Sequence, residues 1–348
     1  MKRLRWPRPL LAILGVALLS AVGAAALPDN PYQRWQLIEN TLYGNATWAY
    51  ERIHFDPAPI DVAIIGSSRT LLGLSGPCIA EKLAADGLPL NVANLSVIED
   101  GRNIQWAIAR ELFRFKKPRV LVMVMGSSFH PWGHPGFKYI APAAGIAAPP
   151  APLLHNWPLD LIYLPYRQIE LAGAALLPHA FGLRPAFDPA IYRAKPIDFT
   201  VSQTLADGKR YDMDAPRTAE YLRDEAAAFA GQHHPSHLPA AIRRVTERDE
   251  PAYSDAVIHM ARAAGVPVLF AYLPEFEGPR VSQTAAFYGQ RGRIIDFSDL
   301  AQQAGLYQSF AHLNHKGAMI ASDRVARAVE ATLRPAAAAT AGPAAGAS

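Results

Sequence analysis

Two segments far apart in the chain carry a serine and a histidine, residue types that can together perform nucleophilic catalysis. Ser68 lies in Gly66-Ser-Ser-Arg69, and His312 lies in Ser309-Phe-Ala-His-Leu-Asn-His-Lys-Gly317. A serine hydroxyl becomes a strong nucleophile when a neighbouring histidine accepts its proton. Ser68 is therefore a candidate nucleophile and His312 a candidate general base. The alternative for Ser68 is an ordinary Ser-Ser turn that caps a helix.

The elements around these segments favour a meeting of the two side chains. The apolar run Ile60–Ile65 is typical of a strand that is buried on both faces of a parallel sheet. Gly66 permits a sharp turn, where unpaired amides can stabilise an oxyanion. His312 precedes a predicted helix over about 316–333. In an open α/β sheet, loops at the carboxyl ends of the strands converge on one crevice.

The rest of the pattern predicts the fold class. Strands are expected at 60–66, 90–95, 119–125, 266–273 and 293–297, and helices at 77–86, 102–115 and 253–264. This alternation predicts a three-layer α/β/α (flavodoxin-like) sandwich with a parallel sheet over residues 58–334. Asn314 is expected to cap the last helix, and Asn94 to hold the loop after the second strand.

Residues outside this alternation divide into a linker, an insertion and a tail. Residues 28–57 form a linker whose aromatic spacing over 31–53 predicts one amphipathic helix, packed on the domain or lying on a membrane. Residues 130–250 form an insertion, in which a hairpin is expected at 198–212 and helices at 218–230 and 238–246. Ala, Pro and Gly dominate 335–348, a tail predicted to be disordered.

The Gly-Ser-Ser-Arg segment and the His-Leu-Asn-x-x-Gly segment resemble the SGNH (GDSL-like) hydrolase superfamily. The likeness is greatest to membrane-anchored bacterial members that act on cell-envelope polymers, and it covers about residues 58–334. It implies Ser68 as nucleophile and His312 as general base. It also implies an oxyanion hole formed by the backbone amides of Ser68 and Gly101.

The chain departs from the family pattern at the acid that normally stands three residues before the histidine. Ser309 occupies this position. Its hydroxyl or a main-chain carbonyl could accept a hydrogen bond from the imidazole, and Asp296 or Asp299 could replace the missing acid. In a serine protease, loss of the orienting acid lowers turnover by about 10⁴.

A second departure follows the strand predicted at 119–125. The family commonly carries an Asn there as a side-chain oxyanion donor, whereas this chain has Gly126-Ser-Ser-Phe129 with Ser128 in the donor position. A hydroxyl still donates one hydrogen bond. Loss of one oxyanion donor costs roughly 3 kcal/mol, so slow catalysis or a changed role is expected.

The N-terminus predicts export. The basic residues Lys2, Arg3, Arg5 and Arg8 precede an apolar run over 10–27, near the lower limit of the roughly 17 to 25 residues of a membrane helix. Residues 1–9 are expected in the cytoplasm, and 10–27 in a bacterial inner membrane as a single-pass anchor, with the domain on the periplasmic side. Alternatively, Ala24–Ala26 forms a signal-cleavage site and the protein is secreted.

Composition argues against several classes of function. The net charge of +4 is matched by the basic residues before the apolar run, so no nucleic-acid partner is expected. A single cysteine, Cys78, excludes an intramolecular disulfide. His130 and His134 are separated by Pro and Gly, and His233, His234 and His237 lie in a polar turn. Because no closed ligand set is present, neither a metal nor another cofactor is expected.

These observations lead to two functional hypotheses. The first is a serine esterase or O-acyltransferase acting on ester groups of a cell-envelope glycan. The second is a non-catalytic glycan-binding or assembly subunit that works with partner proteins of an envelope polysaccharide machinery. Arg69 either binds an anionic substrate group or structures the turn. The apolar stretch 153–183 is either a lid, a membrane contact or simple packing.

Overall fold

The core of the protein is a five-stranded parallel sheet with the strand order β2-β1-β3-β6-β7. The computed structural model describes residues 8–151, 156–204, 208, 210–215, 217–232 and 249–334. The strands are β1 (Val62–Ile65), β2 (Val92–Asn94), β3 (Val120–Met125), β6 (Val268–Tyr272) and β7 (Arg293–Asp296). The strand order reverses between β1 and β3, and ligands of open α/β sheets bind outside the carboxyl ends of the strands at such a point.

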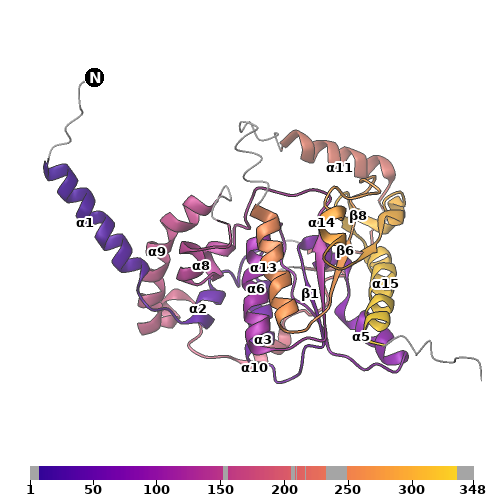
Figure 1. Cartoon of the computed structure of the whole chain (residues 1–348), viewed down its shortest axis with the longest axis horizontal. Helices are drawn as coiled ribbons and strands as arrows, with labels where there is room; N and C mark the ends of the chain where they lie inside the picture. Colours follow the sequence, from indigo (N-terminus) through magenta and orange to yellow (C-terminus); the bar gives the residue numbers. More distant parts are fainter. Residues whose placement is uncertain are drawn as a thin grey trace, which may run out of the picture.

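Helices cover both faces of this sheet. Figure 1 shows α6 (Arg102–Phe115) and α13 (Asp249–Ala263) on one side, and α5 (Gly76–Ala85) and α15 (His315–Leu333) on the other. Alternate residues of β1 point to opposite faces, because the side-chain period of a strand is two. Ala63 and Ile65 pack in the cluster with α6 and α13, whereas Val62 and Ile64 pack with α5 and α15.

The predicted strands and helices of the α/β domain are confirmed, and no end differs by more than four residues. The architecture is α/β with a parallel central sheet, and it is compatible with the predicted three-layer sandwich. Asn94 holds the loop after β2 as expected, since its Oδ1 accepts from the amide of Ser96 at 3.2 Å. Its Nδ2 also donates to the carbonyls of Thr70 and Leu74 at 3.0 and 2.8 Å.

The prediction of one linker helix within residues 28–57 is wrong. The structure has two helices, α2 (Pro31–Gln36) and α3 (Asn45–His54), with a turn between them. Gly44 ends this turn, and a Cβ there would lie 2.2 Å from the carbonyl oxygen of Glu39. The chain thus folds back so closely at this point that a continuous helix is excluded. Trp35 and Trp48 are 1% and 5% exposed, so the segment packs on the domain.

The described part of the insertion contains helices of 4 to 20 residues and a short hairpin. Its elements are α7 (Phe137–Ile140), α8 (Ala143–Ala147), α9 (Trp157–Leu176), η1 (Pro178–Phe181), α10 (Pro189–Ala194), β4 (Gln203–Thr204), β5 (Arg210–Tyr211) and α11 (Ala219–Gln232). The predicted hairpin and the helix at 218–230 are confirmed. Helix α9 contacts α1, α2, α7, α8 and η1, so a lid over the sheet edge stays a prediction. The predicted helix at 238–246 and His233, His234 and His237 lie outside the described residues.

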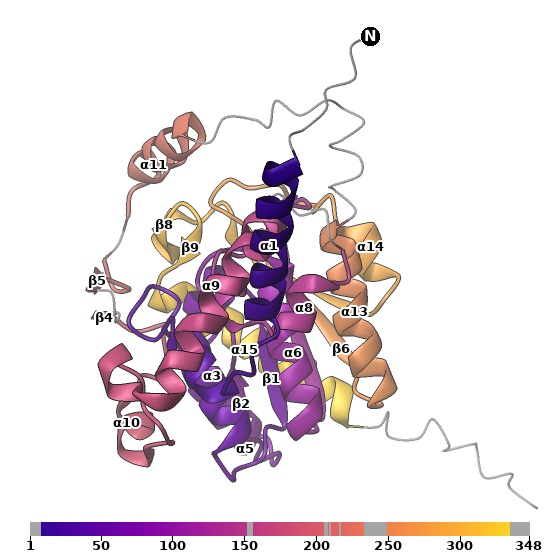
Figure 2. The same cartoon turned by 90° about the vertical axis from the view of Figure 1, so that its left-hand side faces the viewer.

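Helix α1 (Arg8–Ala25) contacts α9, and Figure 1 shows that its N-terminal part extends away from the body of the molecule. In Figure 2, which faces this side, α1 lies in front of the other helices. It covers most of the run 10–27 that was predicted to span a membrane. In the described part of the chain, no helix is long and apolar enough to cross a membrane, so the predicted membrane helix is not found there. Residues 1–7 and the predicted tail at 335–348 are outside the described residues.

Several short elements complete the fold. Helix α4 (Ser68–Gly73) follows β1. Toward the C-terminus the chain forms α14 (Ala285–Gly289), η2 (Ser298–Leu300), η3 (Ala304–Leu306), β8 (Tyr307–Ser309) and β9 (His312–Leu313). Strands β8 and β9 form an antiparallel pair with an irregular register between Tyr307 and Ser309. This pair places Ser309 directly opposite His312.

Candidate active site

Ser68 is presented by a tight turn at the carboxyl end of β1. Helix α4 begins at Ser68 itself, and the amide of Thr70 donates to the carbonyl of Ser67 at 3.0 Å. A Cβ at Gly66 would lie 2.1 Å from Thr70 Oγ1. Only glycine fits this turn, so the short interval between strand and helix depends on it. The turn buries Ser67 and leaves Ser68 half-buried at the sheet edge.

His312 is held by the β8–β9 pair and by the start of the last helix. Two residues after His312, the side chain of Asn314 accepts from the amide of Gly317 at 3.0 Å, which confirms the predicted cap of α15. Asn314 Nδ2 also donates to the carbonyl of Gly305 at 2.8 Å. Asn314 thereby fixes the histidine segment both to the start of α15 and to Gly305, which precedes β8.

The structure brings Ser68, His312 and Ser309 into one hydrogen-bonded row. Ser68 Oγ lies 2.8 Å from His312 Nε2, and Ser309 Oγ lies 2.8 Å from His312 Nδ1. For Nε2 to accept the proton of Ser68, the ring proton must be on Nδ1, where it is donated to Ser309 Oγ. The geometry therefore suits general-base activation of Ser68 with a hydroxyl, rather than a carboxylate, as the orienting group.

The two aspartates considered as replacements for the missing acid have other partners. Both carboxylate oxygens of Asp299 accept from Arg324 at 2.6 Å, and these hydrogen bonds are the main cause of its lowered pKa. Asp296 accepts from the amide and hydroxyl of Ser298 at 2.9 and 3.1 Å. Of the three candidate orienting residues, Ser309 is the one at Nδ1.

Gly101 lies in a loop that admits only glycine. Its φ is +151°, and a Cβ would lie 2.2 Å from the backbone nitrogen of His134. Glu99, two residues earlier, also has a positive φ of 75°. Strained backbone of this kind is concentrated at functional sites. Gly101 directly precedes helix α6 and lines the same pocket as Ser67 and Arg69. Its role as an oxyanion donor, which the family resemblance implies, stays a prediction.

His134 is a positioning residue for this loop that sequence reasoning considered only as a metal ligand. It is fully buried, its Nε2 donates to the carbonyl of Ile98 at 2.7 Å, and its Nδ1 accepts from the amide of Gly136 at 2.9 Å. Its own backbone amide donates to Asn103 Oδ1 at 2.7 Å. The neutral ring thus bridges two loops, a role for which the sequence around His134 holds no recognisable signal.

Burial lowers the pKa of His134 to about 4, and the hydrogen bond to Ile98 and the charge of Asp100 oppose this shift. In the unfolded chain, His134 binds a proton as the pH falls below about 6.5. In the folded chain, the same histidine binds one only below about pH 4. The free energy of unfolding should therefore be highest above pH 6.5 and fall by about 3 kcal/mol on acidification to pH 4. Urea unfolding at several pH values measures this loss.

Two histidine variants separate the contribution of His134 from other acid effects. His134→Gln should flatten the acid limb of the stability profile, because the titrating group is removed. His259→Gln changes an exposed histidine on α13 and should keep the wild-type slope. An unchanged slope in His134→Gln would show that another group causes the acid sensitivity.

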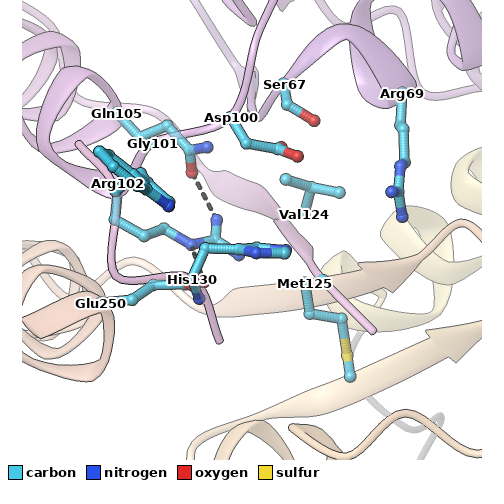
Figure 3. A pocket seen from close by; sticks show the side chains of 12 residues that line it. Ser67, Arg69, Asp100, Gly101, Arg102, Gln105, Val124, Met125, His130 and Glu250 are labelled. Carbon is cyan, nitrogen blue, oxygen red and sulfur yellow. Dashed lines mark hydrogen bonds and ion pairs between the residues drawn. The ribbon is translucent and has the colours of Figure 1, made fainter. Parts of the chain in front are cut away.

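A small pocket lies between the Ser68 turn, the Gly101 loop and the end of β3. Figure 3 shows Ser67, Asp100 and Arg69 along one part of it, and Arg102 and Glu250 along another. The ends of the insertion also contribute, because His130 and Trp132 are lining residues. This position is the carboxyl edge of β1 and β3, where the strand order reverses.

Charged groups line this pocket in paired form. Asp100 as a residue is exposed, but protein atoms crowd its carboxyl group, and this desolvation alone would raise its pKa. The charges of Arg69 and His130 and the hydrogen bond with Ser67 outweigh the desolvation, and the pKa is lowered. Asp100 is thus ionised at neutral pH beside Ser67, the residue before the candidate nucleophile, and sequence reasoning missed it.

A buried ion pair closes the other end of the pocket. Arg102 Nε donates to Glu250 Oε1 at 3.0 Å, and their side chains are 5% and 8% exposed. Glu250 Oε2 also accepts from the amide of His130 at 2.6 Å. Glu250 therefore ties the first residue of the insertion to helix α6. Removal of one member of such a pair is costly, because it leaves an uncompensated charge.

The side chain of Arg69 is held by a residue outside the Ser68 turn. Arg69 lines the pocket and forms an ion pair with Glu275, in the segment after β6. This contact favours the interpretation that Arg69 structures the turn.

Ser128 is half-buried in the bend after β3, and Gly126, not Ser128, lines the pocket. Its role as an oxyanion donor stays a prediction.

The described residues contain no group of three or more His, Cys, Asp or Glu side chains that could hold a metal ion. The row of Ser68, His312 and Ser309 needs none for nucleophilic chemistry. In comparisons with known sequences, the chain matches no protein-family model and no curated protein. The case for a catalytic site accordingly depends on the geometry of these side chains.

Proposed function

We propose that the protein is an SGNH-like serine esterase or O-acyltransferase that acts on ester groups of a cell-envelope glycan. The observation that carries this proposal is the row from Ser68 Oγ through His312 to Ser309 Oγ, with both hydrogen bonds at 2.8 Å. Residues from two segments far apart in the chain meet near the carboxyl end of β1, and ligands of this architecture bind at the carboxyl ends of the strands. The resemblance of the two end motifs supports the reaction class.

The proposed reaction has two halves. Ser68 Oγ attacks the ester carbonyl while His312 Nε2 accepts its proton, and backbone amides of Ser68 and Gly101 stabilise the oxyanion, with Ser128 as a third proposed donor. The protonated ring then donates to the leaving alcohol, which departs and leaves an acyl group on Ser68. In the second half, water or a sugar hydroxyl attacks this acyl group, and His312 again transfers the proton.

A fluorophosphonate probe tests the proposal directly, because it reacts covalently with activated serines. We expect the full-length protein to be labelled at Ser68, as mapped by mass spectrometry of peptides, and Ser68→Ala to remain unlabelled. Denatured wild-type protein provides the control for non-specific reaction. Folded protein that never labels at Ser68 would contradict the proposal.

The hydroxyl of Ser309 should have a measurable but modest effect on this labelling. Ser309→Ala removes the acceptor at His312 Nδ1, and a neutral hydrogen bond contributes roughly 0.5–1.5 kcal/mol, so the labelling rate should fall up to about tenfold. Ser309→Asp introduces the carboxylate that commonly orients the histidine in serine hydrolases. The rate of labelling should therefore rise above that of the wild type. Equal rates for the three proteins would exclude Ser309 as the orienting group.

The second candidate is a non-catalytic glycan-binding or assembly subunit of an envelope polysaccharide machinery. It is favoured by one observation, the neutral hydroxyl at His312 Nδ1 where a carboxylate would stabilise the imidazolium better. If this second candidate is correct, a protein without the Ser68 hydroxyl should keep its fold and still bind sugar.

We also propose that the protein works outside the cytoplasm and against a bacterial membrane, or is secreted if the N-terminal segment is cleaved. Helix α1 exposes a large fraction of most of its aliphatic side chains and packs on α9. Helix α9 itself exposes Leu159, Ile162, Tyr166 and Ile169. Exposed apolar side chains on two helices that contact each other suit contact with lipid.

A further inference from the structure

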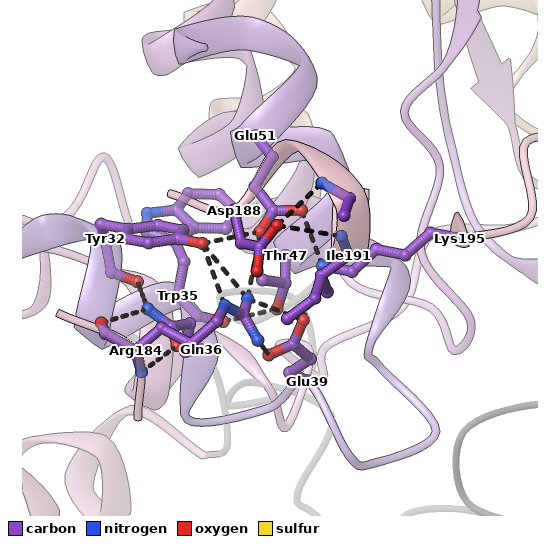
Figure 4. A network of polar contacts seen from close by, with 11 residues as sticks. Tyr32, Trp35, Gln36, Glu39, Thr47, Glu51, Arg184, Asp188, Ile191 and Lys195 are labelled. Atoms are coloured by element: carbon purple, nitrogen blue, oxygen red, sulfur yellow. Dashed lines mark hydrogen bonds and ion pairs between the residues drawn. The ribbon is translucent and has the colours of Figure 1, made fainter. Parts of the chain in front are cut away.

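The insertion is attached to the rest of the molecule at more than one place. At one of them, Arg184 and Lys195 form ion pairs with Glu39 and Glu51 of the linker, at 2.6 to 3.1 Å. Figure 4 shows this network. At another, helix α11 contacts the β8–β9 pair and lies above it in Figures 1 and 2. Because this pair carries His312, the second attachment bears on the candidate active site.

A turn of two residues sets the alignment of the candidate base with its orienting group. Ser309 and His312 are direct partners across the β8–β9 pair, so Phe310 and Ala311 form the turn between them. In a hairpin, the length and conformation of the turn fix the register of the two strands. A displacement of this turn would therefore move Ser309 Oγ from its position 2.8 Å from His312 Nδ1.

Helix α11 supplies two of three contacts that hold the turn residue Phe310. The amide of Phe310 donates to Glu225 Oε2 at 2.7 Å, and a carboxylate acceptor makes such a hydrogen bond shorter and stronger than a neutral one. The ring of Phe310 lies beside that of Phe229, with 5.1 Å between their centroids. The carbonyl of Phe310 accepts from the amide of Phe276 at 2.7 Å. Phe310 is thus held at its amide, its ring and its carbonyl.

Helix α11 is itself fixed relative to β8. Leu222 is fully buried and belongs to the same apolar cluster as Tyr307 of β8. Just before the helix, Arg217 Nε donates to the carbonyl of Gln308 at 3.2 Å. Most of the other described side chains of α11 are exposed. The few residues that attach this helix therefore hold Glu225 in place beside the turn.

We infer that Glu225 is a positioning residue for His312. Its carboxylate fixes the amide of Phe310 and thereby keeps Ser309 Oγ at His312 Nδ1. Glu225 acts through the turn and contacts none of the reacting atoms. The importance of this alignment for ester chemistry rests on the proposed function, whereas the alignment itself does not.

Two conservative variants separate the reach of the Glu225 side chain from its charge. Glu225→Gln keeps an acceptor at the same distance from the backbone, so fluorophosphonate labelling of Ser68 should stay within about threefold of wild type. Glu225→Asp keeps the charge but is one methylene shorter, and labelling should slow about tenfold, because small displacements of catalytic groups lower rates strongly. Glu220→Asp makes the same change at an exposed position of α11 and should have no effect. The inference is wrong if Glu225→Asp labels as fast as Glu220→Asp.

A double-mutant cycle distinguishes positioning from a purely structural role. In the wild-type background, Ser309→Ala removes the acceptor at His312 Nδ1 and should slow labelling up to about tenfold. In the Glu225→Asp background, Ser309 is already displaced, so Ser309→Ala should slow labelling by no more than about twofold further. If the two effects instead multiply, Glu225 does not act through the contact between Ser309 and His312, and the inference is wrong.

Nuclear magnetic resonance of the full-length protein with ¹⁵N-labelled histidine separates this inference from the proposed function. The Nδ1–H signal of His312, assigned by its absence in His312→Ala, should be present in the wild type and in Glu225→Gln and be lost in Glu225→Asp. If this pattern is found but folded protein never labels at Ser68, the inference stands and the esterase proposal fails. If Ser68 labels but Glu225→Asp matches the wild type in both measurements, the inference alone fails.

Discussion

His312→Ala is expected to lower the rate of fluorophosphonate labelling at Ser68 by about 10⁴-fold or more. The physical reason is the 2.8 Å contact between His312 Nε2 and Ser68 Oγ. Without an acceptor for its proton, the hydroxyl is a weak nucleophile at neutral pH. The rate of labelling, followed by intact-protein mass spectrometry, measures this effect independently of any unknown substrate.

His315 supplies a matched control three residues away. Its Nδ1 hydrogen-bonds to the carbonyl of Thr200 at 3.0 Å, and it begins helix α15. His315→Ala removes the same side-chain type from the same segment, so its labelling rate should stay within about threefold of wild type. Similar losses in both variants would mean that His312 acts through the fold of the segment and not as a base.

The second large effect is expected at Gly101. Gly101→Ala would combine a backbone conformation that side chains rarely adopt, φ +151°, with a Cβ that lies 2.2 Å from the backbone nitrogen of His134. Each of these two costs is roughly 1–3 kcal/mol. We expect the free energy of unfolding to fall by about 3–5 kcal/mol. Labelling of the remaining folded protein should also slow, because the loop must move away from Ser68.

Gly87 separates the cost of the backbone conformation from the cost of the clash. It also has a positive φ, of 79°, but a Cβ there would meet nothing within 4 Å. Gly87→Ala should therefore cost only about 1–2 kcal/mol and leave labelling unchanged. Urea unfolding compares the two variants. A Gly101→Ala protein as stable as Gly87→Ala would show that the loop has more freedom than its contacts imply.

The strands and helices of the α/β domain could be predicted from sequence because their causes are local. The run Val120–Met125 is apolar at each position, and all of it is buried in the structure. The prediction failed for the linker, where aromatic spacing over 31–53 suits a helix but the chain folds back at Gly44 against Glu39. Such a close approach of two backbone segments produces no repeating pattern of residue types in the sequence.

The sequence by itself therefore determined the order of the elements, the glycine turn before Ser68 and the pairing of Ser68 with His312 as candidates. Local side-chain patterns and the convergence of strand ends in parallel sheets are sufficient for these conclusions. Only the tertiary structure decided that Ser309, and not Asp296 or Asp299, lies at His312 Nδ1, and that His134 supports the Gly101 loop. The reason is that hydrogen bonds of 3 Å depend on the register of a short hairpin and on the packing of loops distant in the chain, which residue type and spacing do not encode.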